Sequence, residues 1–243
     1  MTGFHRVRGA NPSLVLPRLK ALIFDLDGTM YKQEVLRRAM VWRILRAYLR
    51  HPLRGCRTVR VLQAYRRAQE MLRRNGMTGS PQAQQVRLAA QICKLPKSEV
   101  QSCVDFWSEQ AMGLLLPALR PGLVELLKLA REKGLSLGVL SDYPAEAKLS
   151  SMGLRKYFDV VVTADDPEVQ CFKPSSRGLE IVLRRLGLKK DEAVYIGDRP
   201  DVDAVAAASA GIPCAILTSS YNGSRYWLKI SCFEELSNAL RTH

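Results

Sequence analysis

The stretch LKALIFDLDGTM, residues 19–30, decides the fold of this chain. Its first part, LKALIFD, is short, apolar and rich in strand-forming residues, and it stops at a carboxylate that is soon followed by Gly28 and Thr29. This pattern is typical of a buried strand that ends in a polar loop. Asp25 and Asp27 stand two residues apart at the end of that strand, where the turn at Gly28 lets both carboxylates face one cavity.

Other segments repeat this strand-like character in alternation with helices. Short apolar runs cover residues 135–140, 158–163, 193–196 and 213–217. Amphipathic helical stretches are predicted at 122–133, 175–186 and 201–210, and a last helix near 233–240. Strands that alternate with helices predict an α/β fold, a doubly wound parallel sheet with helices on both faces. Such sheets carry their chemistry at the carboxyl ends of the strands.

Residues 31–116 break this alternation, because their apolar residues recur at helical spacing. Pro and Gly residues divide the segment into about four helices, a common number for a small bundle. We therefore expect three parts: an N-terminal extension (1–18), a catalytic core (19–30 and 117–243) and a small α-helical cap domain (31–116) inserted in the core.

The charge of the chain is strongly basic and unevenly distributed. Lys and Arg number 37 against 23 Asp and Glu, a formal net charge of +14. The segment 31–115 alone holds 16 Lys or Arg against five Asp or Glu, which gives it +11. Either this segment meets an anionic ligand, or it is an arginine-rich surface exposed to solvent.

Cysteine usage and hydropathy indicate the compartment. The six Cys form no CxxC pair and the chain has three His, so a zinc site is not expected. No stretch reaches the roughly 18 apolar residues of a membrane span, and the N-terminus lacks the apolar core of a signal peptide. We therefore expect a cytoplasmic protein with reduced thiols and no membrane partner.

Polar residues also follow the later predicted strands. Ser141 and Asp142 come after the second strand, Lys173 precedes Pro174 and a helix, and Asp198 closes the strand at 193–196. Taken singly, each has a plain explanation as a helix cap, a surface lysine or a turn acid. Because all of them fall at carboxyl edges of one sheet, together they favour a single site.

These residues lie in four short motifs, FDLDGT, VLSD, FKP and IGDRPDVD, in that order. The combination resembles the signature of the haloacid dehalogenase superfamily and spans about residues 19–217. The resemblance implies a Rossmann-like core with a helical cap after the first motif. It also implies an enzyme of the phosphatase branch, which uses Mg²⁺ to hydrolyse a phosphomonoester through an aspartyl-phosphate intermediate.

The resemblance implies catalytic and phosphate-binding roles at the matched positions. Asp25 is the expected nucleophile, and Asp27 the expected acid and base. Ser141, Lys173 and the backbone N–H of Asp142 are expected to bind the phosphoryl group. Asp142 departs from the Asn or Gly that is frequent at this position. A carboxylate so close to a dianion repels it unless it points away or pairs with a base.

For the metal, the resemblance implies Mg²⁺ held by Asp25, Asp198 and the backbone carbonyl of Asp27. Asp203 is the expected second acid of the last motif, in the outer shell of the ion. Asp201 is the alternative, because the spacing in the family varies.

The arginine-rich cap predicts the kind of substrate. The planar guanidinium of arginine suits carboxylate or phosphate, so we expect a small phosphorylated metabolite with a second anion, such as a phosphoglycolate-like compound or a sugar phosphate.

The alternatives are another activity of the superfamily (phosphomutase, phosphonatase or dehalogenase) and a non-catalytic nucleic-acid-binding protein. Dehalogenation would give Asp27 no role as an acid, because a departing halide needs no proton. The complete motifs and an aromatic content of only 7% disfavour a nucleic-acid partner. The basic charge of the cap keeps that alternative open. The oligomeric state stays open.

Overall fold

The computed structural model describes residues 18–76, 79–219 and 227–242 of the chain. Within them, six parallel strands form one sheet in the order β3-β2-β1-β4-β5-β6. The strands are β1 (Ala21–Phe24), β2 (Ser136–Ser141), β3 (Val160–Thr163), β4 (Ala193–Gly197), β5 (Cys214–Leu217) and β6 (Leu228–Ile230). The chain builds outward from β1 to β3 and then from β4 to β6 on the other side. The order therefore reverses beside β1, where open α/β sheets bind their ligands.

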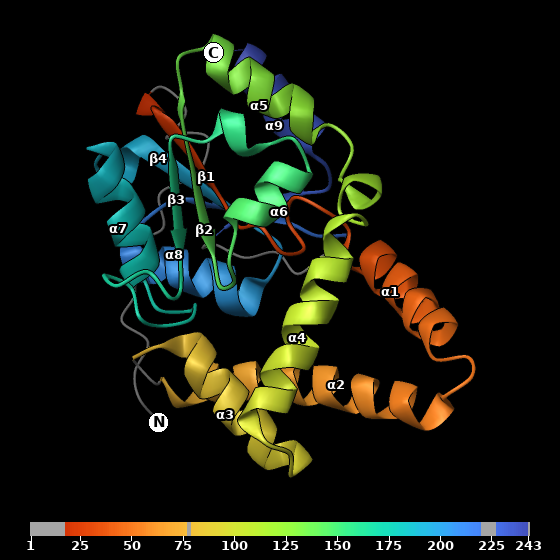
Figure 1. Ribbon diagram of the computed structural model, residues 1–243. Coiled ribbons are helices and arrows are strands. Elements are labelled where there is room, and N and C mark those ends of the chain that lie inside the picture. The colour runs from red at the N-terminus through yellow and green to blue at the C-terminus, as the bar shows by residue number, and fades with distance from the viewer. Residues whose placement is uncertain (1–17, 77–78, 220–226, 243) are drawn as a thin grey trace.

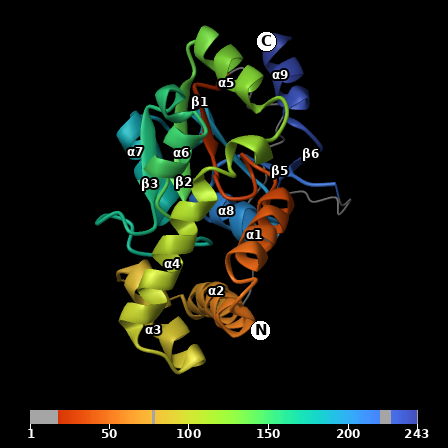
Figure 2. The ribbon, with the colours of Figure 1, turned by 45° about the vertical axis from the view of Figure 1, so that its right-hand side comes forward.

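Helices cover both faces of this sheet (Figures 1 and 2). They are α5 (Leu123–Glu132), α6 (Glu146–Ser151) and α9 (Phe233–Arg241) on one face, and α7 (Arg177–Leu186) and α8 (Val205–Ala210) on the other. Strand β1 contributes side chains to the apolar cores on both faces of the sheet, since successive side chains of a strand point to opposite faces. Leu22 and Phe24 belong to the first core and Ala21 and Ile23 to the second. The predicted doubly wound α/β fold is confirmed.

Four helices separate β1 from β2 along the chain: α1 (Gln33–Ala47), α2 (Pro52–Asn75), α3 (Pro81–Cys93) and α4 (Lys97–Met112). Helices α2, α3 and α4 share a small apolar core of their own, which includes Val61, Ala68, Val86 and Val104. Figure 1 shows the four helices beyond the carboxyl ends of the strands. We call them the cap. The division of the chain into domains stays a prediction, and residues 1–17 of the predicted N-terminal extension lie outside the described residues.

Two short elements escaped the sequence analysis, strand β6 and helix α6. They span three and six residues, too few to show a clear period. The predicted helix at 201–210 also begins differently, as a π-helical turn over Pro200–Ala204 that precedes α8. Among the described helices, none has the length and apolar character needed to cross a membrane.

Candidate active site

Asp25 occupies the centre of the carboxyl edge of the sheet. It follows β1 directly, and its backbone N–H donates to the carbonyl of Ile196 at 2.8 Å, which ties it to β4. The Thr29 hydroxyl donates to Oδ2 at 2.8 Å, and Lys173 Nζ donates to Oδ1 at 2.5 Å. The residue is buried, so one carboxylate orientation is fixed by a partner on each oxygen.

Three acids share this buried edge with a single lysine. One carboxylate oxygen each from Asp25, Asp198 and Asp203 lies within 4.8 Å of the others. Burial raises the pKa of Asp25 well above its usual value; Lys173 opposes this shift, while Asp203 and Asp198 add to it. Burial, together with Asp203, also raises the pKa of Asp198 to about 6. The excess of negative charge is what a divalent cation would offset.

The two acids of the last motif differ in how they are bound. Asp203 is saturated: Oδ1 accepts from Lys173 at 2.7 Å and from Tyr195 at 2.9 Å, and Oδ2 accepts from two backbone N–H groups. The Asp198 carboxylate accepts no hydrogen bond from any residue of the described ranges, and it lies against Gly28, where an added Cβ would overlap it. Asp201 is instead paired with Arg199 outside the cluster. Asp198 is thus the member of the cluster with the most free lone pairs, while Asp25 keeps some, since each of its oxygens accepts one hydrogen bond.

Asp27 has a different environment from Asp25, although the two stand two residues apart. Lys148 Nζ donates to both of its carboxylate oxygens, at 2.6 and 2.8 Å, and the Tyr31 hydroxyl donates to Oδ1. Burial acts to raise the pKa of Asp27, but the ion pair with Lys148 and the hydrogen bond from Tyr31 outweigh it and lower the pKa. The backbone carbonyl of Asp27 accepts from Gln33 at 2.7 Å. Asp27 is therefore held in its ionised form.

The loop after β2 shows how a carboxylate is accommodated at position 142. One oxygen of Asp142 accepts the backbone N–H of Lys173 at 3.0 Å, and the other is paired with Arg73 of α2. The Asp142 charge is thus neutralised by a base from the cap. Ser141 is fully buried, its hydroxyl accepts the N–H of Tyr143 at 3.2 Å, and it is not among the residues that line the cavity above.

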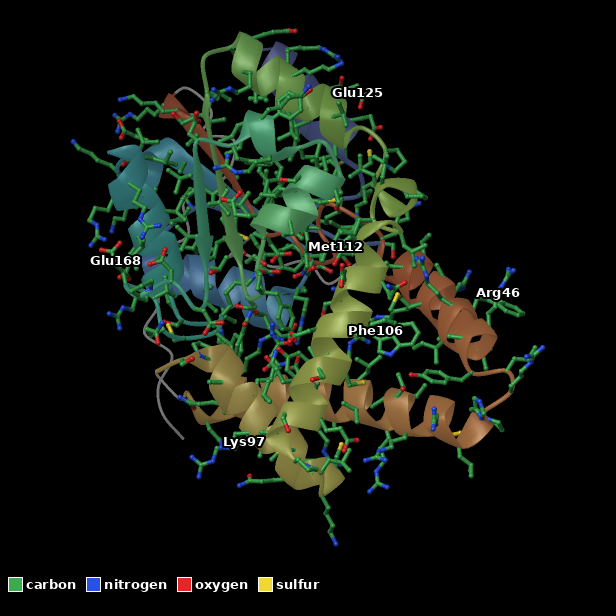
Figure 3. All side chains as sticks on the ribbon, in the orientation of Figure 1. Arg46, Lys97, Phe106, Met112, Glu125 and Glu168 are labelled. Carbon is green, nitrogen blue, oxygen red and sulfur yellow. The ribbon has the colours of Figure 1, made fainter. Side chains whose placement is uncertain are left out.

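A cavity of about 380 Å³ opens over these groups, between the core and the cap. Its core lining includes six of the seven predicted site residues, all but Ser141: Asp25, Asp27, Asp142, Lys173, Asp198 and Asp203. The cap supplies Gln33, Arg37, Arg66, Gln69, Glu70 and Arg73. Glu70 joins both halves, because it accepts from Arg73 at 2.6 Å and from Arg199 of the core at 2.7 Å. Figure 3 shows side chains from the cap and from the strand ends meeting in this region.

A model of the haloacid dehalogenase-like hydrolases matches residues 19–211. The chain belongs to this family. A phosphoglycolate phosphatase of Pseudomonas aeruginosa is 28% identical over 214 residues, which cover 86% of this chain and 72% of the relative. A glyceraldehyde 3-phosphate phosphatase of Methanopyrus kandleri is 29% identical over 80% of this chain and 82% of its own. Among solved structures, a magnesium-bound HAD hydrolase of Bacillus subtilis has a TM-score of 0.71 at 16% identity, over 92% of this chain and 99% of that one. The predicted family is confirmed, and the relatives support the prediction of a phosphatase.

Several residues at the site were not foreseen from the sequence, and three of them supply partners to predicted acids: Tyr31, Lys148 and Arg73. Each contacts a predicted site residue, Asp27 or Asp142. Lys148 and Arg73 lie 121 and 69 residues away from their partners along the chain. Tyr31 lies only four residues after Asp27. Of these three residues, it is the one whose contact could have been predicted from its spacing in the sequence.

Proposed function

We propose that this chain is a Mg²⁺-dependent phosphatase that hydrolyses a small phosphomonoester through a phosphoryl group carried on Asp25. The observation that carries the proposal is the meeting of the buried Asp25 and Lys173 with the half-buried Asp198 at one edge of the sheet. Asp25 attacks phosphorus, so that an Oδ–P bond forms while the bond from phosphorus to the leaving oxygen breaks. Lys173 offsets the negative charge on the transferring group, which is how enzymes stabilise this kind of transition state.

Asp27 is the proposed acid and base of the two steps. Its pairing with Lys148 favours the ionised form, which can take the proton from the water that hydrolyses the phosphoenzyme. In the first step the same carboxyl has to give a proton to the leaving oxygen. An anionic substrate that drew Lys148 away from Asp27 would raise the pKa of Asp27 and suit it to that task.

The donor set fits Mg²⁺, a hard cation that takes oxygen ligands. Asp25, Asp198 and the backbone carbonyl of Asp27 would hold the ion, and Asp203, whose oxygens are already taken, would orient the backbone around it. When bound, the ion would neutralise these acids and the phosphate so that the two anions can approach each other.

For the substrate we propose a compound with a second anion, recognised by Arg37 and Arg66. Both line the cavity from the cap, and neither forms an ion pair with a described residue. Burial and the nearby Arg66 lower the pKa of Arg37, so a negative group between the two guanidiniums would relieve their repulsion. Phosphoglycolate has such a group and glyceraldehyde 3-phosphate does not, so the two relatives support different substrates.

For the location we propose the cytoplasm. The six cysteines are free, which agrees with that compartment.

The test is a panel of phosphate esters assayed with Mg²⁺ and with EDTA. Asp25→Asn is expected to lower kcat/KM by a factor of about 10⁴ or more, because an amide cannot form the phosphoenzyme. Asp201→Asn is the matched control, since Asp201 is a nearby acid outside the cluster. Turnover that survives Asp25→Asn, or that EDTA leaves intact, would refute the proposal.

A further inference from the structure

Helix α1, the turn after it and the first turn of α2 expose several large apolar side chains. Trp42 is 73% exposed, Leu45 56%, Leu49 81% and Leu53 85%. We call these four residues the apolar ridge. Figure 1 shows α1 and the turn that follows it at the right-hand edge of the molecule. Single exposed apolar residues are ordinary, but a group of this size marks a surface that binds something.

The same segment is rich in arginine and lacks acids. Residues 35–60 contain eight Arg and no Asp, Glu or Lys. Four of these arginines interleave with the ridge and form no ion pair with any residue in the described part of the chain: Arg38, Arg46, Arg50 and Arg54. Figure 3 shows Arg46 extending outward from α1. The surface thus combines apolar side chains with unpaired positive charge.

This combination discriminates among possible partners. A second copy of the chain would bring one set of arginines against another, and like charges repel. A nucleic acid would match the arginines but would offer nothing to Leu45, Leu49 and Leu53. The surface of an anionic bilayer matches both kinds of side chain. Its phosphates attract the arginines, and the boundary of its acyl chains accepts Trp and Leu.

We propose that the apolar ridge and its arginines form a peripheral binding surface for anionic lipid bilayers. The prediction of no membrane partner rested on the lack of a membrane-spanning stretch in the sequence, whereas the ridge would lie in the bilayer interface without crossing the membrane. Leu49 and Leu53, the most exposed residues of the ridge, lie where α1 turns into α2. This inference is independent of the proposed phosphatase activity, because none of the ridge residues lines the cavity.

The experiment is co-sedimentation of the full chain with vesicles. Vesicles of phosphatidylcholine and phosphatidylglycerol in equal parts are expected to bind the protein, and vesicles of phosphatidylcholine alone to bind it weakly. Leu49→Ser with Leu53→Ser is expected to weaken binding about tenfold. Arg46→Gln with Arg50→Gln is also expected to weaken it about tenfold, and high salt should do the same. Binding should shift the fluorescence of Trp42 to the blue, and Trp42→Phe should remove the shift.

The controls are Leu228→Ser, an exposed apolar residue on β6, and Lys128→Gln, an exposed base on α5; neither should change binding. Phosphatase activity on a soluble ester should be the same in every one of these variants. The proposal is overturned if anionic vesicles fail to bind the protein at low salt, or if the leucine variants bind as wild type does. It is also overturned if the ridge proves to hold two copies together in sedimentation velocity, or to bind RNA through the arginines with no effect of the leucines.

Discussion

The strand ends of the core and the inner face of the cap hold their charges in opposite ways. In the core, Lys173 contacts Asp25 and Asp203, and none of these side chains is more than 6% exposed. In the cap, Arg37 and Arg66 line the cavity from the solvent side, and both are exposed. Every phosphomonoester presents the same phosphoryl group, whereas leaving groups differ. Buried, fixed charges suit the constant part of the substrate, and exposed charges that can rearrange suit the variable part.

The core half of this comparison is tested most severely by Lys173→Met. The change leaves the buried carboxylates of Asp25 and Asp203 without their cation, and breaking a buried ion pair in this way costs about 3–5 kcal/mol. We expect the free energy of unfolding in urea to fall by about that amount without Mg²⁺, and kcat to fall by about 10³. Lys133→Met, at an exposed position, should alter neither quantity. An unchanged free energy of unfolding would mean that the lysine does not hold the acids together.

The boundary between the two regions is tested by Arg73 and Asp142, which form a buried ion pair across it. Arg73→Met alone leaves the Asp142 carboxylate unpaired beside the cavity, and we expect a loss of about 3 kcal/mol in unfolding free energy. Combined with Asp142→Asn, which removes that charge, the loss should be smaller than the sum of the single losses by about 2 kcal/mol. The same cycle on Arg155 and Glu146, an exposed pair, should give less than about 1 kcal/mol. Strict additivity at Arg73 and Asp142 would contradict a coupling of cap to core.

The sequence predicted those parts of the molecule that local patterns encode. Asp25 and Asp198 were placed correctly at strand ends, because a buried strand and the polar loop after it are adjacent in the chain. The bases that pair with Asp27 and Asp142 come from distant segments, and on α6 or α2 such residues look like ordinary surface charges. A carboxylate at 142 was expected either to point away from the phosphate or to pair with a base, and the structure shows it paired with Arg73. Which base it is depends on how the cap docks, which no local pattern reveals.

The pH dependence of stability tests the acid cluster through a smaller expected change in the free energy of unfolding. The pKa of Asp198 rises from 3.8 to about 6 on folding, so the native state holds this proton more tightly than the unfolded state. Its contribution is therefore fully present below about pH 4 and is lost as the pH rises through 6, a change of at most about 3 kcal/mol. In EDTA, urea unfolding from pH 4 to 7 should show wild type losing stability relative to Asp198→Asn. Mg²⁺ should stabilise wild type more at pH 7 than at pH 5. Parallel curves for the two proteins would show that burial does not act on this carboxyl.

The cap half of the comparison predicts the smallest effect, because exposed charges are screened by solvent. Phosphoglycolate and ethyl phosphate have leaving groups of similar size, and only the first leaving group is charged. Arg37→Gln with Arg66→Gln should lower kcat/KM for phosphoglycolate about tenfold and leave that for ethyl phosphate within about twofold. Arg67→Gln is the matched control, since Arg67 neighbours Arg66 on α2 but does not line the cavity. If wild type itself shows no preference between the two esters, the arginines do not select a second anion. The proposed core chemistry would stand in that case, because Asp25 and Lys173 would act only on the phosphoryl group that the two substrates share.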